Sequence, residues 1–158
     1  MIPGEFQSRP RELQRSLPTS HRSTGERAPS VRKLRFLIVD DTDELRELMA
    51  RMVERAGHVA DEAADGVEAT LALSSQRYDV MLLDLSMPRM SGQDVVRWLD
   101  AHPDLAPGIR TVVVTAWGGE NRGTLQELGI TDVLAKPFRL QQLMDLIADI
   151  TAEITAAG

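Results

Sequence analysis

Four short apolar runs in this sequence each end in a residue with a reactive or charged side chain. The segments FLIVDD, VMLLD, TVVVT and VLAK place Asp40 with Asp41, Asp84, Thr115 and Lys136 at these ends. A run of three to five aliphatic and β-branched residues between polar residues is typical of a buried parallel strand. Ligands of an open α/β sheet bind at the carboxyl ends of its strands, so we expect these five residues to converge at one edge.

Helical patterns separate the apolar runs. Apolar side chains at helical spacing predict helices over residues 43–56, 65–75, 95–99, 121–128 and 140–154. We expect Thr42 to cap the first of these, and Asp65 with Glu68 to form a capping box at the second. The weaker strand pattern at 59–63 contains acidic residues, which favours an edge position. Alternating strands and helices predict an α/β fold with a parallel sheet covered on both faces.

Charge is distributed unevenly along the 158 residues. Residues 1–33 hold seven Lys and Arg and three Glu, which is +4, so residues 34–158 carry −10 of the total of −6. Residues 1–33 are rich in Pro, Ser, Thr, Arg and Gln and are expected to be a disordered tail or linker, whose opening MIPGEF resembles a vector-derived sequence. Residues 34–158 are expected to form one folded domain, and their acidity argues against nucleic acid as a partner.

Composition excludes several kinds of site and of cellular location. The chain has no cysteine, which excludes disulfides and thiolate metal sites. It has no apolar stretch near the roughly 20 residues of a membrane span and no signal-peptide core at its start. We therefore expect a cytoplasmic protein with no membrane partner.

The residues at the strand ends suit phosphoryl chemistry. Carboxylates from Asp40, Asp41 and Asp84 are the oxygen ligands that Mg²⁺ prefers. A carboxylate also acts as a nucleophile toward phosphorus, and Lys136 and Thr115 supply the charge and hydroxyl that neutralise phosphoryl oxygens. Each residue alone also fits a structural role, as a turn residue, a helix cap, a β-former or a strand-end charge. Their combination at strand ends favours the chemical interpretation.

These motifs resemble the receiver domain of two-component response regulators. The resemblance covers about residues 34–155 and rests on FLIVDD, LLDLSMPRMSG, VVVTA and LAKPF. Thr115 follows Asp84 by 31 residues and Lys136 follows it by 52, as in receivers. The resemblance implies a flavodoxin-like, doubly wound sheet of five parallel strands in the order 2-1-3-4-5, with five helices.

The resemblance also implies a role for each residue near the acidic cluster. Asp84 is then the phosphoacceptor, phosphorylated by a histidine kinase with Mg²⁺ as cofactor. Asp41 is a direct metal ligand, Asp40 a ligand through water, and the backbone carbonyl of Ser86 completes the set.

A second group of residues is expected on the phosphoryl side. Lys136 pairs with the phosphoryl group, and its peptide bond to Pro137 is cis. Thr115, with the backbone of Ala116, is the switch that moves toward that group. Two further positions modulate the switch. Val133 stands where receivers often carry Tyr or Phe, which weakens the expected coupling to the threonine. Trp117 is placed either to shield the phosphoryl group from water or to sit exposed on a loop.

The expected function is a signalling switch and not an enzyme beyond self-catalysed phosphotransfer and autodephosphorylation. Its partners are a sensor histidine kinase or phosphotransfer protein and an unknown downstream protein. It is either a stand-alone regulator or a receiver excised from a hybrid kinase or larger regulator. Two alternatives remain open: a haloacid dehalogenase-type phosphatase, whose Asp-x-Asp signature is missing at the strand end, and a degenerate receiver that only binds partners. His58 and His102 follow helices and are expected to be surface caps.

Overall fold

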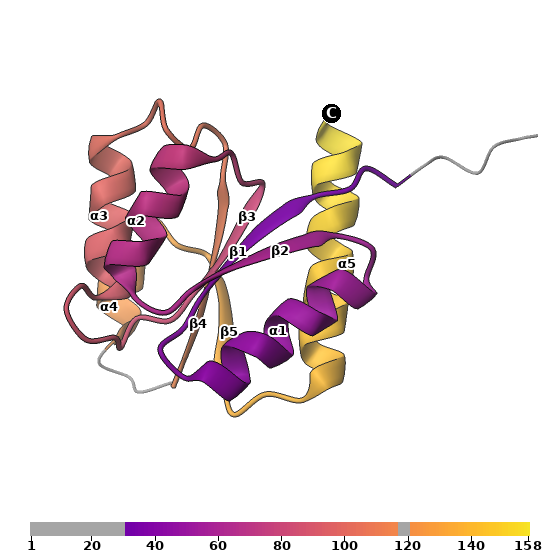
Figure 1. Ribbon diagram of the computed structural model, residues 1–158, viewed down its shortest axis with the longest axis horizontal. Coiled ribbons are helices and arrows are strands. Elements are labelled where there is room, and N and C mark those ends of the chain that lie inside the picture. The colour runs from indigo at the N-terminus through magenta and orange to yellow at the C-terminus, as the bar shows by residue number, and fades with distance from the viewer. Residues whose placement is uncertain (1–30, 117–120) are drawn as a thin grey trace, which may run out of the picture. The chain divides into compact units, whose positions relative to one another are not determined.

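The computed structural model describes residues 31–116 and 121–158, which form five successive βα units (Figure 1). The strands are β1 (Arg35–Val39), β2 (Val59–Ala63), β3 (Val80–Leu83), β4 (Arg110–Ala116) and β5 (Asp132–Lys136). The helices are α1 (Asp43–Arg55), α2 (Gly66–Ser75), α3 (Gly92–Ala101), α4 (Asn121–Glu127) and α5 (Leu140–Ala157). Among the described residues, none of these helices combines the length and apolar character needed to span a membrane.

The strands form one parallel sheet in the order β2-β1-β3-β4-β5, which confirms the expected order. In the pairing of β1 with β3, Val39 lies opposite Leu83, so Asp40 and Asp84 leave the sheet side by side. The acidic strand β2 lies at an edge, as its composition predicts. Charged side chains on an edge strand discourage pairing with another chain.

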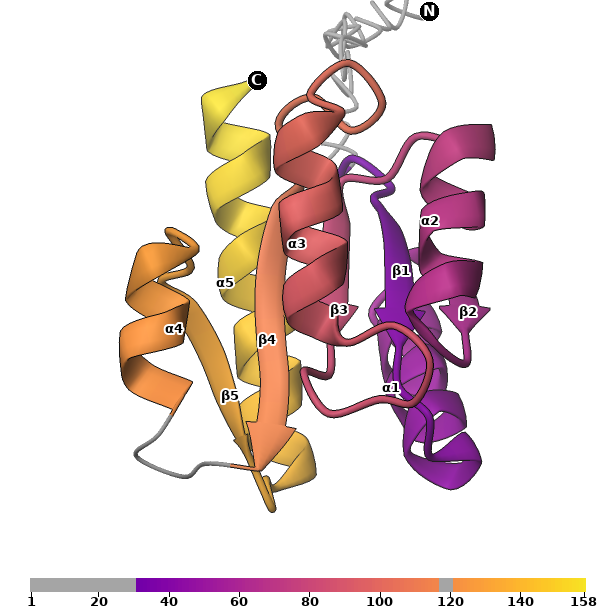
Figure 2. The ribbon, with the colours of Figure 1, turned by 90° about the vertical axis from the view of Figure 1, so that its left-hand side faces the viewer.

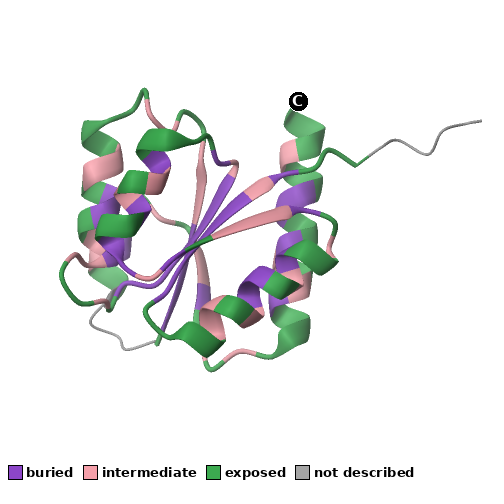
Figure 3. Ribbon diagram, viewed as in Figure 1, coloured by how far each residue is buried: buried purple, intermediate pink, exposed green. Residues whose placement is uncertain are grey.

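Helices cover both faces of the sheet and divide the core into two parts (Figure 2). Phe36 and Ile38 belong to the part beneath α1 and α5, whereas Leu37 and Val39 belong to the part beneath α2 and α3. This alternation follows from strand geometry, in which successive side chains point to opposite faces. Figure 3 shows the central strands as the most deeply buried segments, which makes their carboxyl ends rigid supports for side chains.

The helix starts differ in part from expectation. Asp65 accepts a hydrogen bond from the Glu68 N–H at 2.9 Å, but the Glu68 carboxylate accepts from the Ala64 N–H at 2.7 Å, one residue before the expected partner. Thr42 precedes α1 as predicted, yet its side chain forms no capping hydrogen bond with the described residues. Its backbone N–H instead donates to Asp40 Oδ1 at 2.9 Å, so the Asp40 carboxylate shapes the turn into α1.

The prediction that His58 is a surface cap is wrong, because the residue is 6% exposed. Its Nδ1 accepts the Leu34 N–H at 3.3 Å, and its Nε2 lies 2.9 Å from Thr151 Oγ1. Thr151 in turn donates to the Ile147 carbonyl at 2.7 Å. This chain of hydrogen bonds assigns the proton to Nε2 of a neutral ring. Burial lowers the pKa of His58, as expected for a cation without solvent.

Candidate functional site

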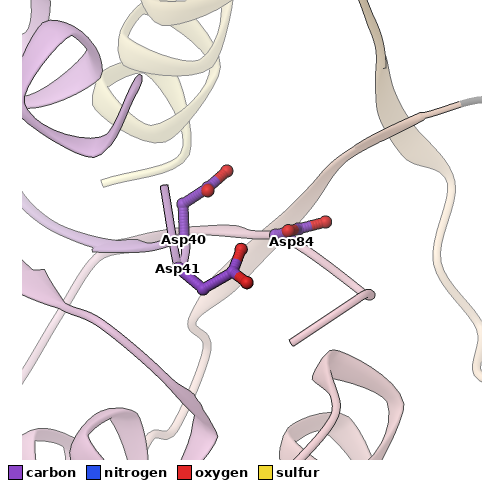
Figure 4. A group of neighbouring side chains, drawn as sticks. All are labelled: Asp40, Asp41 and Asp84. Atoms are coloured by element: carbon purple, nitrogen blue, oxygen red, sulfur yellow. The ribbon is translucent and has the colours of Figure 1, made fainter. Parts of the chain in front are cut away.

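The carboxyl ends of β1 and β3 bring three carboxylates together. One carboxylate oxygen from each of Asp40, Asp41 and Asp84 lies within 4.8 Å of the others. Figure 4 shows the three side chains close to one another at these strand ends, with that of Asp40 pointing upward in this view and those of Asp41 and Asp84 pointing to the right. The two ends are held in register because the Asp84 N–H donates to the Val39 carbonyl at 2.9 Å. Two segments that are far apart in sequence, Asp40–Asp41 and Asp84, thus share one small acidic site.

Lys136, at the end of β5, lies against this cluster. Its Nζ is 2.7 Å from Asp40 Oδ2 and 3.5 Å from Asp84 Oδ2. Asp40 is fully buried, and its other oxygen accepts the Thr42 N–H, so both of its oxygens are engaged. Asp41 is exposed to solvent. The Asp40 carboxylate is therefore held in place by its own contacts, whereas the Asp41 carboxylate is open to a ligand.

The environment of Asp84 penalises its negative charge. Burial raises the pKa of the Asp84 carboxyl, and the neighbouring charges of Asp40 and Asp41 raise it further. The Lys136 ammonium and the Ser86 N–H, which donates to Asp84 Oδ1 at 3.3 Å, act in the opposite direction. A positively charged ligand would relieve this repulsion, because clustered carboxylates destabilise one another's ionised form.

The donor set fits Mg²⁺. Mg²⁺ is a hard cation that takes oxygen ligands, binds through one or two carboxylates and keeps several water molecules. The cluster offers carboxylate oxygens from three residues, with Asp41 open to solvent. Ser86, exposed on the loop directly after β3, lies two residues beyond Asp84.

Thr115 and Ala116 end β4 next to the end of β5. The register pairs Thr115 with Ala135 and Ala116 with Lys136. Thr115 is buried and Ala116 is exposed. The structure thus brings the hydroxyl-bearing strand end to the same edge as the lysine. The Lys136–Pro137 peptide bond, which follows directly, is cis.

Of the two positions expected to modulate the switch, only Val133 is among the described residues, and it lies on the α4 side of the sheet. Val133 is half-buried and packs with Leu85, Val113 and Leu125, between the sheet and α4. Its side chain therefore fills space in a small apolar cluster and supplies no ring to the switch. Trp117 lies outside the described residues.

The sequence pattern did not single out Arg46, whose side chain stabilises the turn after β1. Its guanidinium donates to the Asp40 carbonyl at 2.9 Å, to Asp43 at 2.7 Å and to Glu62 at 3.0 Å. These bonds tie the β1–α1 turn to the end of β2. The spacing of Asp43 and Arg46, three residues apart on α1, was an available signal for one of the three contacts.

Comparisons with known proteins agree on one family. A family profile described as "Response regulator receiver domain" matches residues 36–148. The chain is 37% identical over 112 residues to the response regulator MprA of Mycobacterium ulcerans, a match covering 70% of this chain and 47% of that protein. The chain therefore spans about half the length of the curated relatives that it matches.

Solved structures lead to the same family. The chemotaxis protein CheY4 of Vibrio cholerae is similar with a TM-score of 0.69 and 26% identity, over 75% of this chain and 99% of that one. The response regulator protein TrrA of Thermotoga maritima, solved in complex with Mg²⁺-BeF, is similar with a TM-score of 0.64 and 27% identity, over 74% of this chain and 98% of that one.

The chain belongs to the response regulator receiver domain family of two-component systems, and the expected family and CheY-like fold are confirmed. Receiver domains are signalling proteins and are generally not classed as enzymes. They bind Mg²⁺ at an acidic pocket, and response regulators interact with histidine kinases or phosphotransfer proteins. A phosphorylation-based signalling switch is consistent with this family.

Proposed function

We propose that this chain is a cytoplasmic signalling switch that accepts a phosphoryl group on Asp84 from a phosphohistidine of a sensor histidine kinase or phosphotransfer protein. The position of Asp84 carries the proposal. Its side chain is 6% exposed, one of its oxygens lies within 4.8 Å of oxygens of Asp40 and Asp41, and its Oδ2 lies 3.5 Å from the Lys136 ammonium. A carboxylate beside both a potential cation site and an ammonium is equipped for nucleophilic attack on phosphorus.

The acidic side of the site would hold the metal. Asp41, Asp84 and the Ser86 carbonyl are assigned as Mg²⁺ ligands, and Asp40 as a ligand through water. Bound Mg²⁺ supplies positive charge that offsets the charge of the phosphoryl oxygens. This assignment is supported by the exposure of Asp41 and by the engagement of both Asp40 oxygens.

The opposite side would hold the phosphoryl group. An Asp84 oxygen bonds to phosphorus, the phosphorus–nitrogen bond of the phosphohistidine breaks, and the imidazole leaves with the electron pair. The Lys136 ammonium, now shared by two carboxylates, binds one phosphoryl oxygen, and the Thr115 hydroxyl and Ala116 N–H bind another. The resulting movement of Thr115 is the proposed signal to a downstream protein.

A groove beside the site supports docking of the phosphoryl donor. Its volume is about 530 Å³, and its lining comprises Leu45, Leu48, Ala116, Lys136, Pro137, Phe138 and Leu140. Leu140 is 47% exposed, although it is a large apolar residue next to the functional lysine. We infer that an apolar helix face of the histidine-bearing partner packs here. Leu140→Asp should slow transfer from such a protein, while labelling by acetyl phosphate stays unchanged.

Labelling with acetyl phosphate and Mg²⁺ tests the central proposal. Intact-mass spectrometry should show one added phosphoryl group on the wild-type chain and on Asp100→Asn, an exposed control on α3. Asp84→Asn should remain unlabelled. Full labelling of Asp84→Asn would refute the assignment. Continuous hydrolysis of a phosphate monoester such as p-nitrophenyl phosphate would favour the phosphatase alternative, and absence of labelling in the wild type would favour a degenerate receiver.

A further inference from the structure

The loop from Leu85 to Ser91 joins the proposed phosphoacceptor to α3 and carries Ser86, so its conformation matters for the acidic site. The loop is closed at its base because the Gly92 N–H donates to the Leu85 carbonyl at 3.0 Å. A Cβ atom on Gly92 would lie 2.2 Å from the Asp84 carbonyl oxygen, which shows how tightly the two loop ends meet. The tip of the loop needs a separate anchor, because closure at the base leaves several residues between the ends.

Arg89, at this tip, has an unfavourable backbone conformation. Its φ is +67°, and it is the one non-glycine residue with positive φ in the described ranges 31–116 and 121–158. The Met90 N–H donates to the Pro88 carbonyl at 2.8 Å, which closes a three-residue γ-turn around Arg89. A residue with a Cβ is strained in such a region and persists there where surrounding contacts over-determine its conformation. The side chain of Arg89 makes one such contact.

That contact is an ion pair with Asp65. The Arg89 guanidinium meets Asp65 Oδ2, and Asp65 Oδ1 accepts the Glu68 N–H in the first turn of α2. The side chain of Asp65 is 2% exposed, whereas that of Arg89 is 66% exposed. A buried carboxylate needs its partner far more than a surface carboxylate does, because solvent does not replace the lost cation.

The neighbouring residues form a second contact in the same place. A Cβ atom on Gly66 would lie 2.6 Å from the Met90 carbonyl oxygen, so the start of α2 and the loop tip touch at the backbone. The loop tip is therefore anchored to α2 by an ion pair and by a close backbone contact. The residues that form this anchor are Arg89, Asp65, Gly66 and Met90, and none of them belongs to the acidic cluster.

We propose that Arg89 is a positioning residue, whose ion pair with Asp65 fixes the loop that carries Ser86 and thereby sets the affinity of the acidic site for Mg²⁺. The inference rests on the proposed function, in which the Ser86 carbonyl is a metal ligand. A loop that samples several conformations presents this carbonyl for only part of the time, and the apparent affinity falls by that fraction. Loss of the ion pair should raise the Mg²⁺ dissociation constant roughly 3–10-fold.

Charge alone makes the opposite prediction for one variant. Arg89→Asn removes a positive charge near an acidic site, and simple Coulomb attraction then predicts tighter Mg²⁺ binding. Loop positioning predicts weaker binding. Asn tolerates positive φ, so this variant should fold without the backbone strain of other replacements. The sign of the change therefore separates the two explanations.

Calorimetric titration of the full chain with Mg²⁺ provides the test. We expect weaker binding in Arg89→Asn and in Asp65→Asn, which keeps a good N-cap but loses the charge. The double variant should be no weaker than either single variant, because both remove the same contact. Arg89→Lys should recover most of the affinity. Arg51→Ala, which removes an exposed arginine paired with Glu47 on α1, is the control and should not weaken binding.

Two outcomes separate the inference from the function on which it rests. Unchanged or tighter Mg²⁺ binding by Arg89→Asn, with the wild type binding normally, overturns the positioning role and leaves the proposed function intact. If the chain that carries both Asp84→Asn and Asp41→Asn binds Mg²⁺ as tightly as the wild type, the positioning role and the proposed function are both overturned. Thermal melts of every variant serve as a check of folding, and a lower melting temperature without a change in Mg²⁺ affinity also overturns the positioning role.

Discussion

Asp84→Asn should stabilise the metal-free protein, even though it removes the proposed phosphoacceptor. Charges about 4.8 Å apart interact by about 3.5 kcal/mol at an effective dielectric constant of about 20, and Asp84 faces Asp40 and Asp41 within that distance. The two repulsions together come to about 7 kcal/mol, and attraction to Lys136 at 3.5 Å offsets about 5 kcal/mol of them. Screening around exposed Asp41 brings these charge interactions close to balance, so burial, the largest cause of the raised pKa, leaves the charge of Asp84 disfavoured.

We therefore expect Asp84→Asn to raise the free energy of unfolding by about 1–2 kcal/mol at neutral pH without metal. The asparagine oxygen is still able to accept the Ser86 N–H, and Lys136 keeps its partner Asp40 at 2.7 Å. Mg²⁺ should stabilise the wild type more than the variant, since it binds the folded state of the wild type more tightly. Urea unfolding with EDTA and with Mg²⁺ measures both effects.

The pH dependence of this difference follows from the raised pKa of Asp84. Above the pKa of the unfolded chain, the unfolded state loses its proton while folded Asp84 retains it, so the wild type loses stability as pH rises through that interval. The advantage of Asp84→Asn should therefore grow from about pH 4 to neutral pH. Asp100→Asn, on the exposed face of α3, should change stability by less than about 0.5 kcal/mol. Destabilisation by Asp84→Asn in EDTA would refute the charge argument.

Three further predictions concern other parts of the structure. Lys136→Ala should lower metal-free stability by about 2–3 kcal/mol, because buried Asp40 loses its cation, and should tighten Mg²⁺ binding in calorimetry. Gly92→Ala should cost more than about 2 kcal/mol in urea unfolding, since its Cβ would lie 2.2 Å from the Asp84 carbonyl oxygen. His58 has a lowered pKa, so its contribution to stability should be complete above about pH 6.5 and be lost as the pH drops below that value, where the unfolded chain takes up the proton first.

Matched variants control these experiments. Gly123→Ala, on α4 with nothing within 4 Å of the new Cβ, should not destabilise the protein. His58→Gln should remove the part of the pH dependence that lies below about pH 6.5, and His102→Gln, at an exposed histidine, is the matched variant. Weaker Mg²⁺ binding by Lys136→Ala, or a pH profile that His58→Gln leaves intact, would contradict the corresponding argument.

The sequence predicted those features that depend on local pattern. The apolar runs located the strands, and the polar residue after each run marked the edge where Asp40, Asp84 and Lys136 meet. Contacts between distant segments left no such signal. Nothing in the stretch around His58 indicates that Thr151, on α5, would bury it.

The same limit applies to the loop after Asp84. The sequence shows an arginine between Pro88 and Met90, but its positive φ and its ion pair with Asp65 depend on how α2 packs beside the loop. Thr42 illustrates a milder case, in which the position of the helix start was right and the hydrogen bond came from Asp40 instead.

Because the site is built from separate strands, its parts are synthesised at different times. Asp40 and the Lys136 that neutralises it are 96 positions apart, so the acidic cluster is made by the ribosome well before its counter-ion. A nascent chain that has released β1 and β3 but not β5 contains the carboxylates without the ammonium. Pairing across such separations is slow compared with local folding. Competence for the proposed phosphorylation of Asp84 should therefore appear only after β5 has been synthesised and has joined the sheet.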